Sequence, residues 1–201
     1  MPLSRCPPRG ASANDKNPDA LDAKRPEREG LGRSRGGLST KIHLAADGRC
    51  RPLVTALTAG QRHDSLVFTH VLDRVKVLPG RGRRGRSRTR PDRVLADKAY
   101  SSRAARSYLR RRGIRATIPQ PKDQVGHRKR RGSHGGRPPA FDPVAYKDRN
   151  TVERAVNKLR QFRAVATRYD KRAYVYQGSI HVATIRIWLN DPTQNPLRDT
   201  P

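Results

Sequence analysis

The sequence has few acidic residues, cysteines or aromatic side chains, and no long apolar run. Its 17 Asp and Glu stand against 45 Lys and Arg, and its glutamates are Glu27, Glu29 and Glu153 alone. The two cysteines, Cys6 and Cys50, form no metal-binding spacing and no disulfide framework, which indicates a reduced, intracellular setting. No apolar run reaches membrane-spanning length, and the N-terminus lacks the apolar core of a signal peptide.

The strongest feature of the composition is a formal net charge of +28. A charge of this size repels itself unless an anionic partner neutralises it, and nucleic acid is the commonest such partner. An anionic membrane surface would require a basic amphipathic helix with large apolar residues on its other face, and the sequence contains none. We therefore predict a cytoplasmic, nucleoid-associated protein that binds nucleic acid and does not enter a membrane.

The chain divides into a central domain and two flanks. Hydrophobic residues make up only 33% of the chain, so part of it must lie outside a packed interior. The proline-rich segment 1–31 lacks strand or helix periodicity, and the tail 191–201 is polar, so we expect disorder in both. The domain then spans 32–190. It includes two basic loops, 79–92 and 122–140, which contain few apolar residues.

Local patterns predict a mixed α/β domain. Residues alternate around Ile42 and Leu44, turn at Asp47-Gly48, and continue as a strand over 53–58, which is typical of an antiparallel hairpin. The later elements are, in order, a helix over 65–75, a strand over 94–97, a helix from Ser101 to Gly113, a strand in 114–121, a helix from Tyr146, and a strand turning into a helix over 174–189. The helix that starts at the two serines 101 and 102 has residues suited to an N-cap, and Gly113 is a good C-terminal stop.

Two carboxylates occupy places that call for an explanation. Asp97 ends the apolar run 94–96, where an unpaired charge is costly. Glu153 shares one helical face with four polar residues, namely Tyr146, Arg149, Asn157 and Arg160. If the strand end and the helix converge at a sheet edge, the two carboxylates suit Mg²⁺, a hard cation that also binds phosphate oxygens.

Ordinary structural roles remain open for the acids. Asp97 could cap the helix that follows it or pair with a nearby arginine. Glu153 could lie on the helix surface, paired with Asn157 or Arg149. Asp64, in "RHDS", is the predicted N-cap of the helix over 65–75, with a catalytic role as the alternative. The histidines His43, His63 and His70 lack metal-ligand spacing, and we interpret them as structural or solvated.

Several motifs resemble one protein family. The stretches "GRSRGGLSTKIHLA", "GQRHDS", "LADKAYSS" and "YKDRNTVERAVNKLRQFRAVATRYDK" are similar to the catalytic domain of bacterial insertion-sequence transposases of the DDE class. More narrowly, they resemble the branch with a Tyr-Arg-Glu-Lys signature, and the resemblance runs from Gly32 to Leu189. It implies a ribonuclease-H-like mixed sheet flanked by helices. It also implies cutting of double-stranded DNA at element ends and joining of the 3′-hydroxyls to a target, with Mg²⁺ or Mn²⁺.

The resemblance assigns roles to individual residues. Asp97 corresponds to the second catalytic acid and Glu153 to the third, both as metal ligands. Tyr146 and Arg149 match the first two signature residues, and Arg160 stands at the signature lysine, where a planar guanidinium replaces a compact ammonium. The cations that we expect near DNA are Arg33, Arg35, Lys41, Lys98 and Lys158.

The first acid of the family has no counterpart in this sequence. It lies on the first strand, upstream of the segment that matches "GRSRGGLSTK", where this chain has its proline-rich segment. We therefore expect the first strand to be missing, to be supplied by the product of an upstream reading frame, or to have been lost in a relic. A non-catalytic basic nucleic-acid-binding remnant and a basic ribosome-associated protein are the alternatives consistent with the charge. A second copy of the chain is a further candidate partner, which would make a homo-oligomer.

Overall fold

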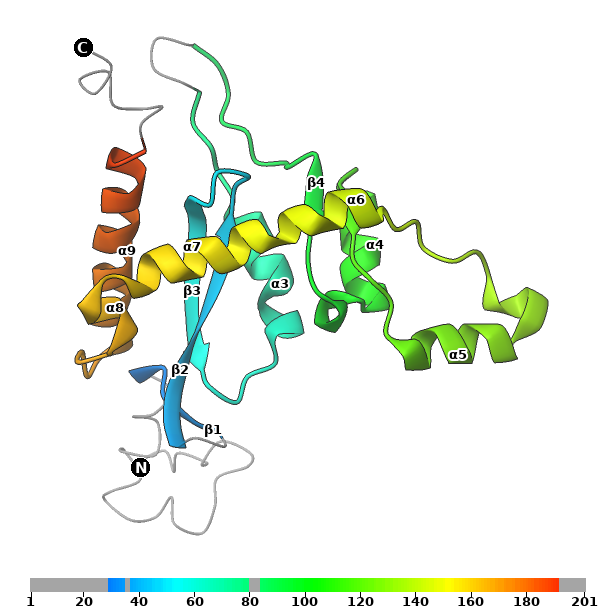
Figure 1. Ribbon diagram of the computed structural model, residues 1–201, viewed down its shortest axis with the longest axis horizontal. Helices are drawn as coiled ribbons and strands as arrows, with labels where there is room; N and C mark the ends of the chain where they lie inside the picture. The colour runs from blue at the N-terminus through cyan, green and yellow to red at the C-terminus, as the bar shows by residue number, and fades with distance from the viewer. Residues whose placement is uncertain (1–28, 35–36, 80–83, 192–201) are drawn as a thin grey trace, which may run out of the picture.

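The computed structural model describes residues 29–34, 37–79 and 84–191, and Figure 1 shows how they are arranged. Strands dominate the first half and helices the second. The elements are β1 (Gly32–Ser34), β2 (Gly37–Ala46), β3 (Pro52–Ala59), α3 (Asp64–Asp73), β4 (Arg93–Leu95), the 3₁₀ turn η2 (Lys98–Tyr100), α4 (Arg103–Arg111), β5 (Arg115–Thr117), α5 (Lys122–Arg130), η3 (Gly132–Gly135), α6 (Pro143–Tyr146), η4 (Lys147–Arg149), α7 (Asn150–Arg160), α8 (Arg163–Ala166) and α9 (Ala173–Leu189). The chain is thus a mixed α/β protein, as predicted.

A long antiparallel hairpin of β2 and β3 lies at the centre of the fold (Figure 1). Its register pairs Ile42 with Leu57, and β1 adds a short third strand on the other side of β2. Asp47 closes the turn, because its Oδ1 accepts the backbone N–H groups of Arg49 and Arg51 at 3.0 and 2.9 Å. Aspartate favours turns for this reason, and the predicted hairpin is confirmed.

The two faces of the hairpin carry separate hydrophobic cores, because side chains alternate between the faces of a strand. The first core packs the hairpin against α3, α4 and β5, and its buried residues are Val54, Ala56, Val67, Phe68, Val71, Leu72, Val75, Ala105, Leu109, Ile114 and Ile118. The second core packs the other face against α7, α8 and α9. Its buried residues are Leu159, Val165, Tyr176, Ile180, Ala183 and Ile187, and Ile42, Leu44 and Leu57 of the hairpin lie against them. Figure 1 shows α7 crossing the hairpin and α9 beside β3.

A second, parallel sheet is formed by β4 and β5, which α4 connects. Val94 pairs with Ala116 in its register. Ser102 caps α4, with its hydroxyl oxygen accepting the Ala105 N–H at 3.1 Å, as the sequence predicted. Gly113, at φ +65°, follows the last helical turn and lets the chain enter β5, which confirms the predicted stop.

The single mixed sheet that the resemblance implied is not present among the described residues. They form a three-stranded antiparallel sheet and a two-stranded parallel sheet, with no hydrogen-bond ladder between the two. Both sheets nevertheless border the first core, since Val94 and Ala96 pack against the same cluster as Val54 and Ala56. The two sheets therefore pack against one core but are not hydrogen-bonded to each other.

The loop predicted over 122–140 is wrong over most of its length, because residues 122–130 form α5 and residues 132–135 form η3. Asp123 lies in the first turn of α5 and basic residues occupy its last turn, an arrangement that the helix dipole favours. None of the α5 residues is buried, so the helix lacks the apolar stripe by which a sequence pattern would reveal it. In Figure 1, α5 projects away from the rest of the protein.

The C-terminal prediction of a strand turning into a helix is also wrong, because 173–189 form one helix, α9. The segment is rich in β-branched and aromatic residues, which favour strands. Packing of Tyr176, Ile180, Ala183 and Ile187 against the second core decides in favour of the helix. No helix of the described residues is long and apolar enough to cross a membrane.

Parts of the predicted domain plan lie outside the described residues. These parts are residues 1–28 of the N-terminal segment, residues 80–83 of the first basic loop, and the tail after residue 191. Val77 and Arg88 pair across that first loop through backbone hydrogen bonds of 2.9 and 2.8 Å.

Candidate active site

Asp97 follows the end of β4 by two residues and begins η2. Its Oδ1 accepts the backbone N–H of Ala99 at 2.9 Å, so one carboxylate oxygen caps this short turn. The longer helix α4 is capped by Ser102 instead. Asp97 thus caps η2 and not α4. Among the described residues, no hydrogen bond or ion pair involves its Oδ2.

Asp64 lies opposite two residues of β2, Lys41 and His43, which point to the α3 side of the hairpin. Lys41 Nζ is 3.0 Å from Asp64 Oδ1 and also donates to the carbonyl oxygen of Arg62 at 2.9 Å. Asp64 Oδ1 is buried and accepts no hydrogen bond of good geometry, so the ion pair with Lys41 compensates its charge. The predicted N-cap role of Asp64 is wrong, because α3 begins at Asp64 itself and no side chain caps it.

His43 is almost fully buried beside this ion pair. Its Nε2 lies 2.7 Å from the Thr58 hydroxyl, and its Nδ1 lies 3.8 Å from Asp64 Oδ1. Burial lowers the pKa of His43; Asp64 opposes this shift, while Lys41 and Arg62 add to it. The imidazole is therefore a neutral structural group, in agreement with the sequence interpretation.

Tyr100 lies within electrostatic range of both Asp64 and Asp97. Burial first, and then the charges of Asp64 and Asp97, raise the pKa of the Tyr100 hydroxyl to about 12. Its ring packs 5.2 Å from that of Phe68, which anchors it on α3. Two carboxylates from different elements thus lie around one protonated tyrosine, an arrangement that the sequence analysis did not predict.

The signature residues form a second group around the start of α7. Arg149 Nη2 donates to Glu153 Oε1 at 2.5 Å, and the Arg149 guanidinium lies 5.8 Å from the Tyr146 ring centroid. Phe141 packs on the same ring at 5.2 Å. The alternative pairing of Glu153 with Arg149 is therefore observed, and the Glu153 side chain stays 56% exposed.

Asp97 and Glu153 are held by different partners. Asp97 accepts the Ala99 backbone N–H, and Glu153 accepts a hydrogen bond from Arg149. Among the described residues, no three His, Cys, Asp or Glu side chains gather into a cluster that could hold a metal ion. The oxygen chemistry of both carboxylates suits Mg²⁺.

Of the cations predicted near DNA, some are exposed, some already have a partner within the chain, and one lies outside the described residues. Arg33 and Lys98 are exposed, and Arg35 lies outside the described residues. Lys41 is engaged by Asp64, and Lys158 Nζ lies 3.4 Å from the Arg49 carbonyl oxygen. Arg160, at the signature lysine, is exposed at the end of α7.

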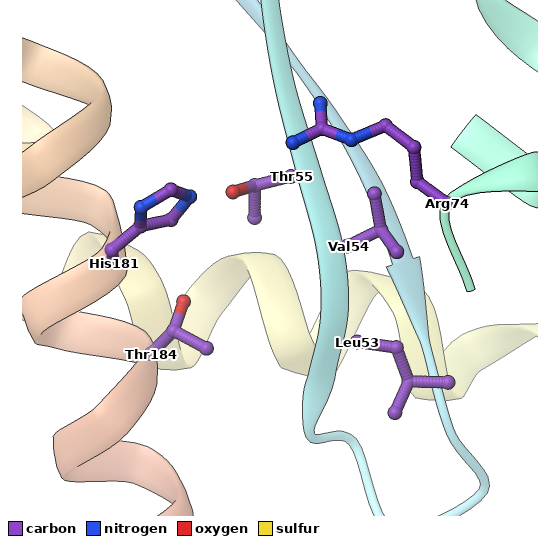
Figure 2. Close-up of a pocket in the computed structure, with 6 residues that line it drawn as sticks. All are labelled: Leu53, Val54, Thr55, Arg74, His181 and Thr184. Atoms are coloured by element: carbon purple, nitrogen blue, oxygen red, sulfur yellow. The ribbon is translucent and has the colours of Figure 1, made fainter. Parts of the chain in front are cut away.

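A small pocket lies elsewhere, along the outer edge of β3 (Figure 2). His181 and Thr184 of α9 face Thr55 across it, and Gln177 Nε2 donates to the Thr55 hydroxyl at 2.7 Å. The residues that line it are Leu53, Val54, Thr55, Arg74, His181 and Thr184. It contains no carboxylate and is therefore separate from the acids.

Comparison with known proteins identifies the family. Residues 14–188 match the transposase DDE domain family, which is most of the chain. The chain belongs to this family. In this transposase domain, Asp97, Glu153 and the residues that resemble the signature all fall inside the matched range.

Two relatives place the transposase domain among insertion-sequence proteins. A protein of Burkholderia cepacia assigned as a transposase for insertion sequence element IS402 is 32% identical over 151 residues, which are 75% of this chain and 63% of that protein. A Brucella ovis protein assigned to insertion sequence element IS6501 is 28% identical over 152 residues, 76% of this chain and 99% of its own length. The chain thus spans less than two thirds of the first relative. No solved structure matches it significantly.

Proposed function

We propose that this transposase domain supplies the second and third acids for cutting and joining DNA at the ends of an insertion element. The observation that carries the proposal is the position of Asp97 at the end of β4, with one oxygen on η2 and Oδ2 directed to no described partner. A carboxylate held in this way is oriented for a further ligand. The family match and the exposed carboxylate of Glu153 support the same role.

Asp97 and Glu153 would together hold Mg²⁺ or Mn²⁺. When bound, the metal activates a water or a 3′-hydroxyl and stabilises the leaving oxygen of the phosphodiester. Arg149 fixes the orientation of the Glu153 carboxylate, and the Tyr146 ring limits the freedom of Arg149. The signature therefore orients the third acid before DNA arrives.

An additional strand would complete the site. We propose that it inserts between β2 and β4, which border one core but belong to different sheets. A strand with hydrogen bonds to both would complete the ribonuclease-H-like mixed sheet, and it would carry the first acid. The segment would come from another part of the protein or from the product of an upstream frame. Without it, the domain binds DNA but does not cut it.

The basic surfaces support binding to the DNA backbone. Four of the nine residues of α4 are arginines, and α5 ends in four consecutive basic residues, 127–130, on a projecting segment. Such surfaces bind phosphates without reading sequence. Because these basic surfaces need no metal to bind phosphates, they also fit a second candidate, a DNA-binding remnant without catalysis.

Cleavage assays on acid-to-alanine variants distinguish the two functions. We would fuse the chain to a segment that supplies the strand and compare Asp97→Ala, Glu153→Ala and Asp92→Ala on DNA carrying the element ends. Asp92 is the matched control, an exposed carboxylate paired with Arg88 at 2.5 Å. We expect cleavage to be lost in the first two variants and retained in the third.

A thiolate ligand tests metal contact directly. Asp97→Cys should lose cleavage in Mg²⁺ and regain part of it in Mn²⁺, since the softer ion accepts sulfur more readily. Unchanged cleavage in Asp97→Ala and Glu153→Ala would refute the catalytic assignment. DNA binding with a steep salt dependence but no cleavage in any fusion would instead support the remnant.

A further inference from the structure

The pocket along the outer edge of β3, which we call the β3 pocket, is lined by hydrogen-bond donors that lack an acceptor. Arg74, the residue that follows α3, extends towards β3 near Thr55 (Figure 2). His181 and Thr184 of α9 line the other side of the pocket. Among the described residues, no hydrogen bond or ion pair involves the Arg74 guanidinium. Because arginine carries five N–H donors and no acceptor, this guanidinium is available to an anionic ligand.

Gln177 determines where two of the other protons lie. Its Nε2 donates to the Thr55 hydroxyl oxygen at 2.7 Å and to His181 Nε2 at 2.8 Å. An amide nitrogen only donates, so His181 Nε2 is the acceptor and the proton of the neutral imidazole lies on Nδ1. The Thr55 oxygen accepts, so its own proton remains free to donate. Since Thr55 is only 4% exposed, the protein holds this donor in place.

The Thr184 hydroxyl is buried and forms no hydrogen bond with any described residue. Threonine in a helix can bond the carbonyl oxygen four residues back, but this hydroxyl does not. Figure 2 shows its oxygen directed towards His181 and Thr55. A buried hydroxyl without a partner costs free energy, and a ligand oxygen in the β3 pocket would satisfy it.

The size of the β3 pocket fits one small oxyanion. Its volume is about 140 Å³. A cavity of about 150 Å³ holds a benzene molecule, and a phosphate group is no larger than benzene. A whole nucleotide is too large for this volume. The pocket can therefore enclose one phosphate group, while anything attached to that group stays outside.

We propose that the β3 pocket binds a single phosphate group, with the Arg74 guanidinium and the Thr55 and Thr184 hydroxyls as donors. A guanidinium binds two phosphate oxygens at once, and the net charge of +28 attracts anions to the protein. A phosphate of the DNA backbone and a free phosphate ion present the same oxygens, so the pocket fits both. Neither Asp97 nor Glu153 lines it, so the proposal does not depend on the proposed catalysis.

Calorimetric titration of the full chain with inorganic phosphate tests the pocket, with sodium chloride of equal ionic strength as the reference. Arg74→Gln and Thr184→Val should each weaken phosphate binding at least about tenfold, because each removes a hydrogen bond to a charged oxygen. The matched controls are Arg154→Gln and Thr69→Val. Both positions are exposed and lie outside the pocket, so these variants should bind phosphate as the wild type does.

Thermal unfolding separates phosphate binding from a structural role. Without phosphate, Thr184→Val should melt at the same or a higher temperature than the wild type, because it removes a buried hydroxyl that has no partner. With phosphate, the wild type should gain stability that Arg74→Gln and Thr184→Val lack, since a ligand stabilises the state that binds it.

Binding of a short DNA duplex of arbitrary sequence distinguishes the two sources of phosphate. If the DNA backbone supplies the group, Thr184→Val should weaken duplex binding without any change in charge, whereas Thr69→Val should not. If the pocket takes only the free ion, Thr184→Val should weaken binding of inorganic phosphate and leave duplex binding unchanged. Wild-type phosphate binding in Arg74→Gln and Thr184→Val, or equal losses in the two controls, would overturn the proposal.

Discussion

The two faces of the β2–β3 hairpin hold different cores, so damage to one core shows whether the protein unfolds as one unit. Leu109 is fully buried in the first core, and Leu159 is 2% exposed in the second. Shortening a buried leucine to alanine costs about 2–5 kcal/mol, from lost burial and from the cavity left behind. At about 3 kcal/mol, each variant should lower the melting temperature by roughly 6–12 °C in a protein of this size.

Two probes report on different parts of the molecule. Trp188, the only tryptophan, donates its indole N–H to the Pro52 carbonyl oxygen at 2.8 Å and reports on the α9 side of the hairpin. Circular dichroism reports on all helices. If the shared hairpin couples the cores, urea unfolding of Leu109→Ala should shift both signals to the same lower midpoint. The double variant with Leu159→Ala should be additive within about 0.5 kcal/mol.

The reasoning fails if the probes separate. A Leu109→Ala variant that shifts the circular dichroism midpoint but leaves the Trp188 midpoint unchanged would show that the cores unfold independently. Leu66→Ala, at a residue 66% exposed, is the control and should change the free energy of unfolding by less than about 0.5 kcal/mol.

Three further outcomes follow from the structure. The free energy of unfolding should fall as pH drops below about 6.5, because the unfolded state protonates His43 before the folded state, whose His43 pKa is lowered by burial. His43→Gln should flatten this pH dependence. Ser102→Ala should cost about 1 kcal/mol in urea unfolding, and Ser102→Asp should restore it. Glutamine at the basic positions 129–131 should reduce the slope of log affinity for DNA against log salt by about 2–3; an unchanged slope would show that α5 does not contact DNA.

Local signals were sufficient for the first half of the fold. Alternation around Ile42, the Asp47 turn, the Ser102 cap and the Gly113 stop each act within a few residues, and the structure confirms all four. The motifs likewise identified the family, since a linear order of residues carries that information. The pairing of Glu153 with Arg149 was among the stated alternatives because the two lie one helical turn apart.

Contacts between distant segments decided the rest. The side chains of 173–189 favour a strand locally, and burial of one face against the second core makes them a helix. Asp64 was expected to cap its own helix, but Lys41, on a strand, holds its carboxylate instead. The division into two sheets depends on which strand edges meet, and edge pairing is a property of the assembled chain. Sequence by itself determined the Asp47 turn, the Ser102 cap and the identity of the chemical residues, because these depend on near neighbours. The tertiary structure decided where the acids lie and which faces remain open, because burial and edge pairing depend on segments far apart in the chain.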